Sequence, residues 1–226
     1  MIDVEVDGVK GWAWPANDRE GWQGVSKDWV DSHKEKYLKH VENWSVCVQA
    51  GGFTGMHPRL LSEMFGRVYT FEPDPLNFYC LTHNCQKDNI IKQQMALGHE
   101  HKLITVNRPR NDNVGMNTIN ENHQIFPMIT LDSLNIDDVG LIQLDVEYYE
   151  LNVLRGAIET VKKFKPVITC ELGYLSYFDA VNQEGLNHNA TIMKDNTLEA
   201  DILDLLGPIG YKKVDQSVSD AIYKVV

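Results

Sequence analysis

The chain has 226 residues, of which 43% are hydrophobic and 23% are charged. These are ordinary values for one globular domain with a substantial core. The formal net charge of −11 argues against a nucleic-acid partner, because such binding needs clustered lysines and arginines to displace counterions. The sequence has no run of about 18 apolar residues and no basic segment leading into an apolar one. We therefore expect a cytoplasmic protein without a membrane partner.

The four cysteines show no disulfide framework for a chain of this length. Cys47 and Cys170 fall inside predicted core strands, so we expect reduced thiols in a reducing compartment. Cys80, His83 and Cys85 suggest a zinc site at first sight. On one helix, however, Cys85 points away from the other two side chains, so we expect no metal there.

All five tryptophans lie in the first 44 residues: Trp12, Trp14, Trp22, Trp29 and Trp44. The opening residues 1–14 alternate between apolar and polar types, which predicts a β-hairpin with its turn at Asp7-Gly8. The aromatic crowding favours an added layer packed on the sheet or across a homodimer contact, and a lid or sugar-stacking surface is the alternative. We expect residues 1–44 to form a Trp-rich extension and residues 45–226 to form the main domain.

The stretch from Val46 to Gly55 predicts a strand that runs into a glycine-rich turn and then into a helix. The helix is indicated by apolar residues at helical spacing from Leu60 to Phe65. Strand, glycine turn and helix form the first unit of the doubly wound α/β sheets that bind nucleotide-like ligands. Glycines let the backbone approach the ligand, and the helix N-terminus offers free N–H groups. A tight loop with no ligand would use the same residues, so this motif alone does not establish ligand binding.

The second motif is Val68 to Phe71 followed by Glu72 and Pro73. It predicts a buried strand ending in a carboxylate about 20 residues after the glycine turn, the interval at which such folds place an acid on ribose hydroxyls. A solvated strand-end acid is the alternative for Glu72. With the glycine turn upstream, we favour ribose binding.

The third motif is the predicted strand Val139 to Glu147, which carries Asp145 and Glu147 at its end. Carboxylates at the carboxyl end of a central parallel strand lie where open α/β sheets bind their ligands. The alternative for Asp145 is the N-cap of the next helix, and Glu147 and Glu150 also suit the first turn of that helix. A fifth strand, Pro166 to Cys170, ends in the same way in Glu171.

The other predicted elements follow from the same patterns. We expect a third strand at 90–97, a β-rich connection at 102–131 that forms an edge hairpin or a ligand cover, helices after Asp74, over 151–161 and over 197–206, and a closing antiparallel pair at 211–214 and 221–226.

The segments VQAGGFTG, FEPDP, ALG, TLDSL, LIQLDVEYYELNVLRGA and PVITCE occur in this order. In this order they resemble the FkbM-type family of class I S-adenosylmethionine-dependent methyltransferases. The resemblance runs from about Val46 to the end of the sequence and is most specific from Asp145 to Ala157. It implies an α/β, Rossmann-like, doubly wound sheet of seven strands, mostly parallel with an antiparallel last strand. It also implies methyl transfer from S-adenosylmethionine to a hydroxyl group.

The resemblance also implies roles for individual residues. The methionine part of the cofactor would lie on the glycine turn, the ribose on Glu72 and Pro73, the adenine beside Ala96 and Leu97, and the reacting methyl group near Asp145. Gln49 and Phe53 stand where the family usually has an aspartate and an asparagine, and Tyr148 stands where it has a glycine. The turn residues assigned to the cofactor are Gln49, Ala50, Gly51, Gly52, Phe53, Thr54 and Gly55.

These patterns together predict an O-methyltransferase that acts on a small hydroxylated molecule, a sugar or a glycan. Asp145 is the expected general base and His57 the second candidate, with Glu147, Tyr148 and Glu171 facing the acceptor. A metal-assisted variant with Asp145 and Glu171 as ligands stays open, although no spacing demands it. Two further hypotheses stay open as well: a cofactor-binding protein without turnover, and a nicotinamide-dependent oxidoreductase.

Overall fold

The computed structural model describes most of the chain. It describes residues 2–6, 9–18, 32, 34–37, 39–108, 114–120, 125–172, 197–216 and 220–226. Trp22, Trp29 and the predicted hairpin turn at Asp7-Gly8 lie outside these ranges. None of the described helices is long and apolar enough to cross a membrane.

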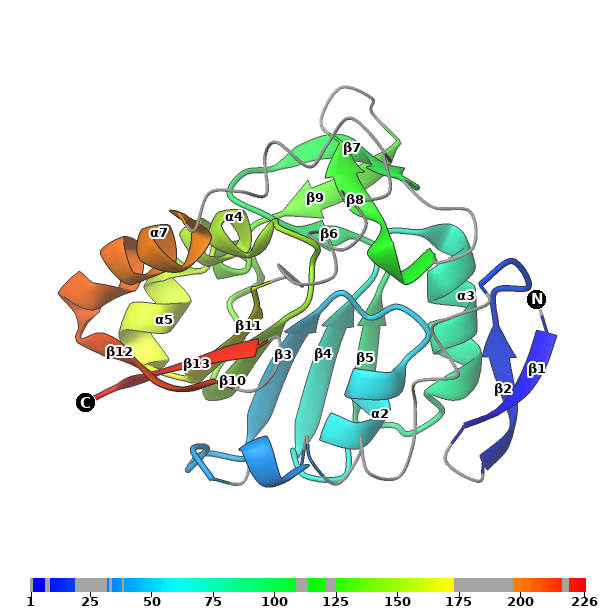
Figure 1. Cartoon of the computed structure of the whole chain (residues 1–226), viewed down its shortest axis with the longest axis horizontal. Coiled ribbons are helices and arrows are strands. Elements are labelled where there is room, and N and C mark those ends of the chain that lie inside the picture. The colour runs from blue at the N-terminus through cyan, green and yellow to red at the C-terminus, as the bar shows by residue number, and fades with distance from the viewer. Residues whose placement is uncertain are drawn as a thin grey trace, which may run out of the picture.

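A seven-stranded sheet with the order β12-β13-β11-β10-β3-β4-β5 forms the centre of the protein (Figure 1). β13 runs antiparallel to both of its neighbours, whereas β11, β10, β3, β4 and β5 are parallel. The predicted sheet with an antiparallel last strand is therefore confirmed. The strands are β3 (Val46–Ala50), β4 (Arg67–Phe71), β5 (Ile90–Gln93), β10 (Val139–Leu144), β11 (Val167–Glu171), β12 (Tyr211–Gln216) and β13 (Asp220–Val225).

The two middle strands, β3 and β10, are buried at every residue, as expected for parallel strands that are covered on both faces. One face carries the larger core, to which α4, α5 and α7 contribute, and the other face packs against α2 and Tyr37. α3 lies along the β5 edge of the sheet (Figure 1). The helices are α2 (Met56–Leu61), α3 (Pro75–Asn84), α4 (Glu150–Arg155), α5 (Ile158–Phe164) and α7 (Thr197–Leu206).

A second sheet, with the order β6-β9-β7-β8, lies beyond the carboxyl ends of β3, β4 and β5 (Figure 1). It corrects the prediction of one strand over 90–97, because β5 ends at Gln93 and the chain bends before Ala96 and Leu97 pair with β9. It confirms the β-rich connection. The strands are β6 (Ala96–Leu97), β7 (Lys102–Asn107), β8 (Thr118–Asn120) and β9 (Phe126–Ile129).

The single helix predicted over 151–161 is also corrected, since it is divided into α4 and α5 around Gly156. A Cβ atom at Gly156 would lie 1.9 Å from the carbonyl oxygen of Gly98, so only glycine lets this turn approach the start of the second sheet. The following helix is then fixed by Asp132, whose carboxylate accepts hydrogen bonds from the amides of Glu159 at 3.0 Å and Thr160 at 2.8 Å.

The predicted N-terminal hairpin is present as β1 (Ile2–Val6) and β2 (Val9–Trp14), which pair antiparallel. β2 packs beside α3, away from the middle of the central sheet (Figure 1). Trp12 and Trp14 are buried. That residues 1–44 form a separate extension remains a prediction.

Candidate active site

The glycine turn, Gly51–Gly55, leaves β3 and enters α2 at the carboxyl edge of the sheet. The amides of Gly51 and Gly52 both donate to the carbonyl oxygen of Phe71, at 3.1 and 3.0 Å, which ties the turn to the end of β4. Gly51 has φ of 85° and Gly55 has φ of 97°, values that glycine adopts without strain. A Cβ atom at Gly51 would lie only 1.7 Å from the carbonyl oxygen of Asp145. The turn therefore packs directly against the end of β10.

Gln49 supports the glycine turn from inside the protein. Its side chain is fully buried, and Nε2 donates to the carbonyl oxygens of Ala50 at 3.1 Å and Gly51 at 2.9 Å. Its Oε1 accepts from the hydroxyl of Thr70 at 2.5 Å. The structure thus places the Gln49 side chain against the turn backbone, where it shapes the turn. Thr54 is buried as well.

Glu72 lies at the end of β4 and faces the glycine turn. Its carboxylate accepts hydrogen bonds from the amides of Phe53 and Asp74, each at 2.8 Å. Burial raises the pKa of Glu72 to about 7, although both amide bonds favour the charged form. Each oxygen has a second lone pair, so a ribose diol can still bind. The position predicted for ribose binding is therefore built as a buried acceptor held by the turn itself.

The residues expected beside the adenine form β6 in the second sheet, shortly after β5 ends at Gln93. Ala96 and Leu97 are buried and pair with β9, so their side chains help to form the wall between the two sheets. Pro73 is half-buried. Asp74 accepts from the amide of Leu76 at 2.9 Å as the N-cap of α3, and Arg108 from the end of β7 forms an ion pair with it.

Three acidic side chains gather where β10 and β11 end. Asp145, Glu147 and Glu171 each place a carboxylate oxygen within 4.8 Å of the others. We call these three residues the carboxylate cluster. Burial raises the pKa of Glu147 to about 8 and of Glu171 to about 7. Burial, followed by the charge of Glu171, holds the pKa of Asp145 well above its ordinary value.

The carboxylate cluster therefore binds protons more tightly than ordinary exposed acids do. Oxygen ligands of this kind also suit Mg²⁺ or Ca²⁺, so the same three side chains could hold a divalent cation. The N-cap alternative for Asp145 is excluded, because α4 begins at Glu150 and has Tyr149 at its N-cap. Glu150 is the acid in the first turn, as predicted, and Glu147 precedes it.

His57, in the first turn of α2, faces the carboxylate cluster. Its Nδ1 atom lies 3.9 Å from Oδ2 of Asp145. The two general-base candidates chosen from the sequence are thus neighbours in space. A shift of about 0.7 Å would bring the two atoms within hydrogen-bond range, and catalytic hydrogen bonds often tighten in this way when a ligand binds.

One basic residue of the site was missed by the sequence reasoning. Lys36 places Nζ 2.5 Å from Oδ2 of Asp220, and both side chains are nearly buried. Asp220 is the register partner of Glu171 in the sheet, and the charge of Lys36 opposes the upward pKa shift of Asp145. Lys36 and Asp220 are 184 residues apart, and no local pattern at either residue signals the pairing.

The turn after Asp145 has an unusual backbone. Glu147 and Tyr148 have φ of 51° and 72°, in the left-handed region that costs residues with a Cβ atom free energy. Such strain in successive residues is typical of functional sites, where the surrounding structure maintains it. It also gives a physical reason for the glycine expected at position 148.

Comparison with known proteins agrees with this geometry. Residues 52–213 match the family model of the methyltransferase FkbM domain. The chain belongs to the FkbM methyltransferase family. This is a family of S-adenosylmethionine-dependent methyltransferases, which favours methyl transfer over the nicotinamide alternative. β1 and β2 lie outside the matched residues. No curated protein sequence matches the chain.

Solved structures share the fold at low identity. The FkbM methyltransferase from Methylobacillus flagellatus KT is 16% identical with a TM-score of 0.49, over 84% of this chain and 50% of that chain. This chain therefore spans about half the length of that relative. A putative caffeoyl-CoA O-methyltransferase from Staphylococcus aureus is 10% identical with a TM-score of 0.52, over 89% of this chain and 85% of that one. An S-adenosylmethionine-dependent methyltransferase from Anabaena variabilis ATCC 29413 is 9% identical with a TM-score of 0.51, over 87% and 84%.

The raised pKa values predict how the stability of the protein depends on pH. Glu72, Glu147, Glu150 and Glu171 have pKa values of about 7 to 8 when folded, against an ordinary value of 4.5. Between the ordinary pKa and these raised values, the folded state binds more protons than the unfolded state does. The free energy of unfolding should therefore fall as pH rises through this range. Urea unfolding near pH 5 and near pH 8 measures this change in the free energy of unfolding. Glu147→Gln should flatten the dependence, and a wild-type stability that rises with pH would contradict the assignment.

The strained backbone at Tyr148 predicts an inverted order of stability for two variants. Tyr148→Ala must keep φ at 72°, whereas Tyr148→Gly adopts it freely, so the glycine variant should be the more stable by about 1 kcal/mol. Tyr79 is the matched control, because it is exposed and lies inside α3. There, alanine should be more stable than glycine by about 1 kcal/mol. Urea unfolding measures the four variants. If alanine is more stable than glycine at position 148 as well as at position 79, the backbone of Tyr148 is not strained.

Proposed function

We propose that the protein is an S-adenosylmethionine-dependent O-methyltransferase that acts on a hydroxyl group of a small molecule, a sugar or a glycan. The observation that carries the proposal is the contact between the glycine turn and the end of β10, where Gly51 leaves no room for a Cβ atom beside Asp145. The residues assigned to the methyl donor and the residues assigned to the acceptor thus meet at one point. Family membership supports the reaction class.

The residues of the glycine turn fit the cofactor. Glu72 offers a buried acceptor to the ribose, and the absence of a side chain at Gly51 lets the turn lie directly against Asp145, the residue assigned to the methyl group. When bound, S-adenosylmethionine supplies an electrophilic methyl group on a sulfonium centre. What the protein adds is position: it holds the acceptor oxygen in line with the bond that breaks, which accounts for much of the rate enhancement in such transfers.

The carboxylate cluster provides what a hydroxyl acceptor needs. Carboxylate oxygens accept hydrogen bonds from sugar-like hydroxyl groups and orient them. When S-adenosylmethionine donates its methyl group, Asp145 would accept the proton of the acceptor hydroxyl, and His57, whose Nδ1 lies 3.9 Å from that carboxylate, is the second candidate for this proton. Burial and the charge of Glu171 raise the pKa of Asp145, which makes this carboxylate a stronger base than an exposed aspartate. Tyr148 and Glu171 would then border the acceptor.

A titration with S-adenosylhomocysteine, with NAD as the comparison ligand, tests the cofactor. Tight binding of the first and none of the second is the expected outcome. Incubation with a methyl-labelled cofactor and a panel of sugars, glycans and small hydroxylated molecules then tests turnover. Binding without labelled product across the panel would favour a binding protein without turnover.

Glu72→Ala should weaken the binding of S-adenosylhomocysteine. A charge-assisted contact to a diol that loses its acceptor costs about 1.5–3 kcal/mol, to be measured by calorimetry on protein that remains folded by circular dichroism. Glu63→Ala is the matched control, because Glu63 is an exposed acid just after the end of α2 and is paired with Lys87. Equal affinities for wild type and Glu72→Ala would remove the ribose assignment.

Asp145→Asn should reduce turnover while leaving the affinity for S-adenosylhomocysteine within a few-fold. An amide keeps the shape of the side chain but cannot take a proton, and the loss of a general base costs about 10²–10⁴ in rate. Asp137→Asn, at an exposed residue paired with Lys163, is the control. If the rate survives and the affinity collapses instead, Asp145 binds the cofactor and the base lies elsewhere.

A further inference from the structure

The side chain of Asn84, at the end of α3, links the N-terminal hairpin to the glycine turn by hydrogen bonds. Its Oδ1 accepts a hydrogen bond from the amide of Ala13 at 2.8 Å, and Nδ2 donates to the carbonyl oxygen of Ala13 at 2.9 Å. The same Nδ2 donates to the carbonyl oxygen of Thr54 at 2.7 Å. Asn84, Ala13 and Thr54 are all buried. The side chain therefore joins β2 to the middle of the glycine turn.

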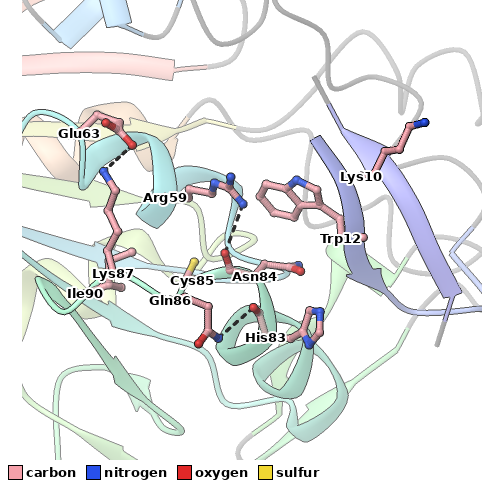
Figure 2. A pocket seen from close by; sticks show the side chains of 11 residues that line it. Lys10, Trp12, Arg59, Glu63, His83, Asn84, Cys85, Gln86, Lys87 and Ile90 are labelled. Atoms are coloured by element: carbon pink, nitrogen blue, oxygen red, sulfur yellow. Dashed lines mark hydrogen bonds and ion pairs between the residues drawn. The ribbon is translucent and has the colours of Figure 1, made fainter. Parts of the chain in front are cut away.

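Two aromatic contacts lie beside this hydrogen-bonded junction. Trp14 meets the ring of Phe53 edge to face, with ring centroids 5.2 Å apart and an interplanar angle of 87°. The guanidinium group of Arg59 lies over Trp12, 4.9 Å from its ring centroid, and faces it across the pocket in Figure 2. Residues of β2 thus contact the glycine turn and the helix that follows it.

The same region of α3 holds the far end of the glycine turn. Cys85 donates from Sγ to the carbonyl oxygen of Gly55 at 3.3 Å, and the amide of Arg59 donates to that oxygen at 3.1 Å. Arg59 also donates from Nη1 to the carbonyl oxygen of Asn84 at 3.4 Å, the contact drawn in Figure 2. The turn from Phe53 to Gly55 is therefore held on its outer side by α3 and the hairpin together.

This support matters because Phe53 has an unfavourable backbone. Its φ is 45°, which residues with a Cβ atom maintain only when their surroundings fix it. In this conformation the amide of Phe53 donates to Glu72, the carboxylate assigned to the ribose. Whatever holds Phe53 therefore also sets the position of Glu72.

We propose that the hairpin β1–β2 positions the cofactor-binding turn, with Asn84 as the positioning residue, so that docking of the hairpin and binding of the cofactor strengthen each other. The proposal rests on the proposed function, because it assumes that the glycine turn binds S-adenosylmethionine. It assigns the tryptophans of β2 to support of the turn. By linkage, the effect is reciprocal: what the hairpin adds to cofactor affinity, the cofactor adds to hairpin docking.

Calorimetric titration of Asn84→Ser and Asn89→Ser with S-adenosylhomocysteine tests the positioning role. Asn89 is a matched control, because its Nδ2 also donates to two backbone carbonyl oxygens, those of Ser62 and Phe65, away from the turn. Both variants should lose stability, but only Asn84→Ser should weaken binding, by about fivefold or more, the lower end of usual coupling between sites. Equal affinities in Asn84→Ser and wild type overturn the proposal.

A second pair of variants tests the proposal even if Asn84→Ser does not fold. Trp14→Phe keeps an aromatic ring but changes its contact with Phe53. Trp44→Phe is the control, because Trp44 packs at a tilted angle against Phe65, with ring centroids 5.0 Å apart. Weaker binding of S-adenosylhomocysteine in the first variant alone supports the proposal. Unchanged binding in both contradicts it.

Hydrogen exchange gives a readout that a merely structural role would not change. Saturating S-adenosylhomocysteine should slow exchange of the Ala13 amide, which donates to Asn84, more than it slows exchange in the β12–β13 pair. An equal effect at both places means general stabilisation only and overturns the coupling. If wild type does not bind S-adenosylhomocysteine at all, the proposed function fails first and the hairpin proposal falls with it. If wild type binds and the variants match it, the hairpin proposal alone fails.

Discussion

The close approach of the glycine turn to the end of β10 is the constraint on which the site depends. Because a Cβ atom at Gly51 would lie 1.7 Å from the carbonyl oxygen of Asp145, two strands that are neighbours in the sheet bring the residues proposed for the cofactor and those proposed for the acceptor to one place. A parallel sheet makes this possible, since the carboxyl ends of β3, β4, β10 and β11 lie along the same edge. Glu72, His57 and the carboxylate cluster take their positions from that edge.

The electrostatics of the site follow from collecting acids in a partly enclosed space. Burial raises the pKa of Glu72, Glu147 and Glu171, and the charges of neighbouring acids add to the effect. Lys36, brought in from the N-terminal part of the chain, forms an ion pair with Asp220 at the rim of the cluster. Acids whose pKa values are raised by burial and by neighbouring charges are characteristic of functional sites.

Residues outside the range matched by the family model contact the glycine turn and the sheet edge beside the carboxylate cluster. Trp14 contacts Phe53, Asn84 joins Ala13 to Thr54, and Lys36 reaches the sheet beside Glu171. Phe53 departs from the asparagine expected in the family, and its ring packs with the hairpin tryptophans. The unusual turn residue and the hairpin therefore form one packed unit, as expected when local strain is maintained by surrounding contacts.

Local patterns in the sequence determined the parallel strands, the glycine turn and the strand-end acids, because burial periodicity and glycine placement are properties of short segments. The division of 90–97 into β5 and β6 and of 151–161 into α4 and α5 followed instead from contacts with distant segments, such as Gly156 against Gly98. Likewise, the sequence identified Asp145 and His57 as candidate bases, but it did not predict that the two side chains lie 3.9 Å apart. Lys36, Asn84 and the strain at Tyr148 emerged only in the tertiary structure, because each depends on partners or backbone angles that no local pattern specifies.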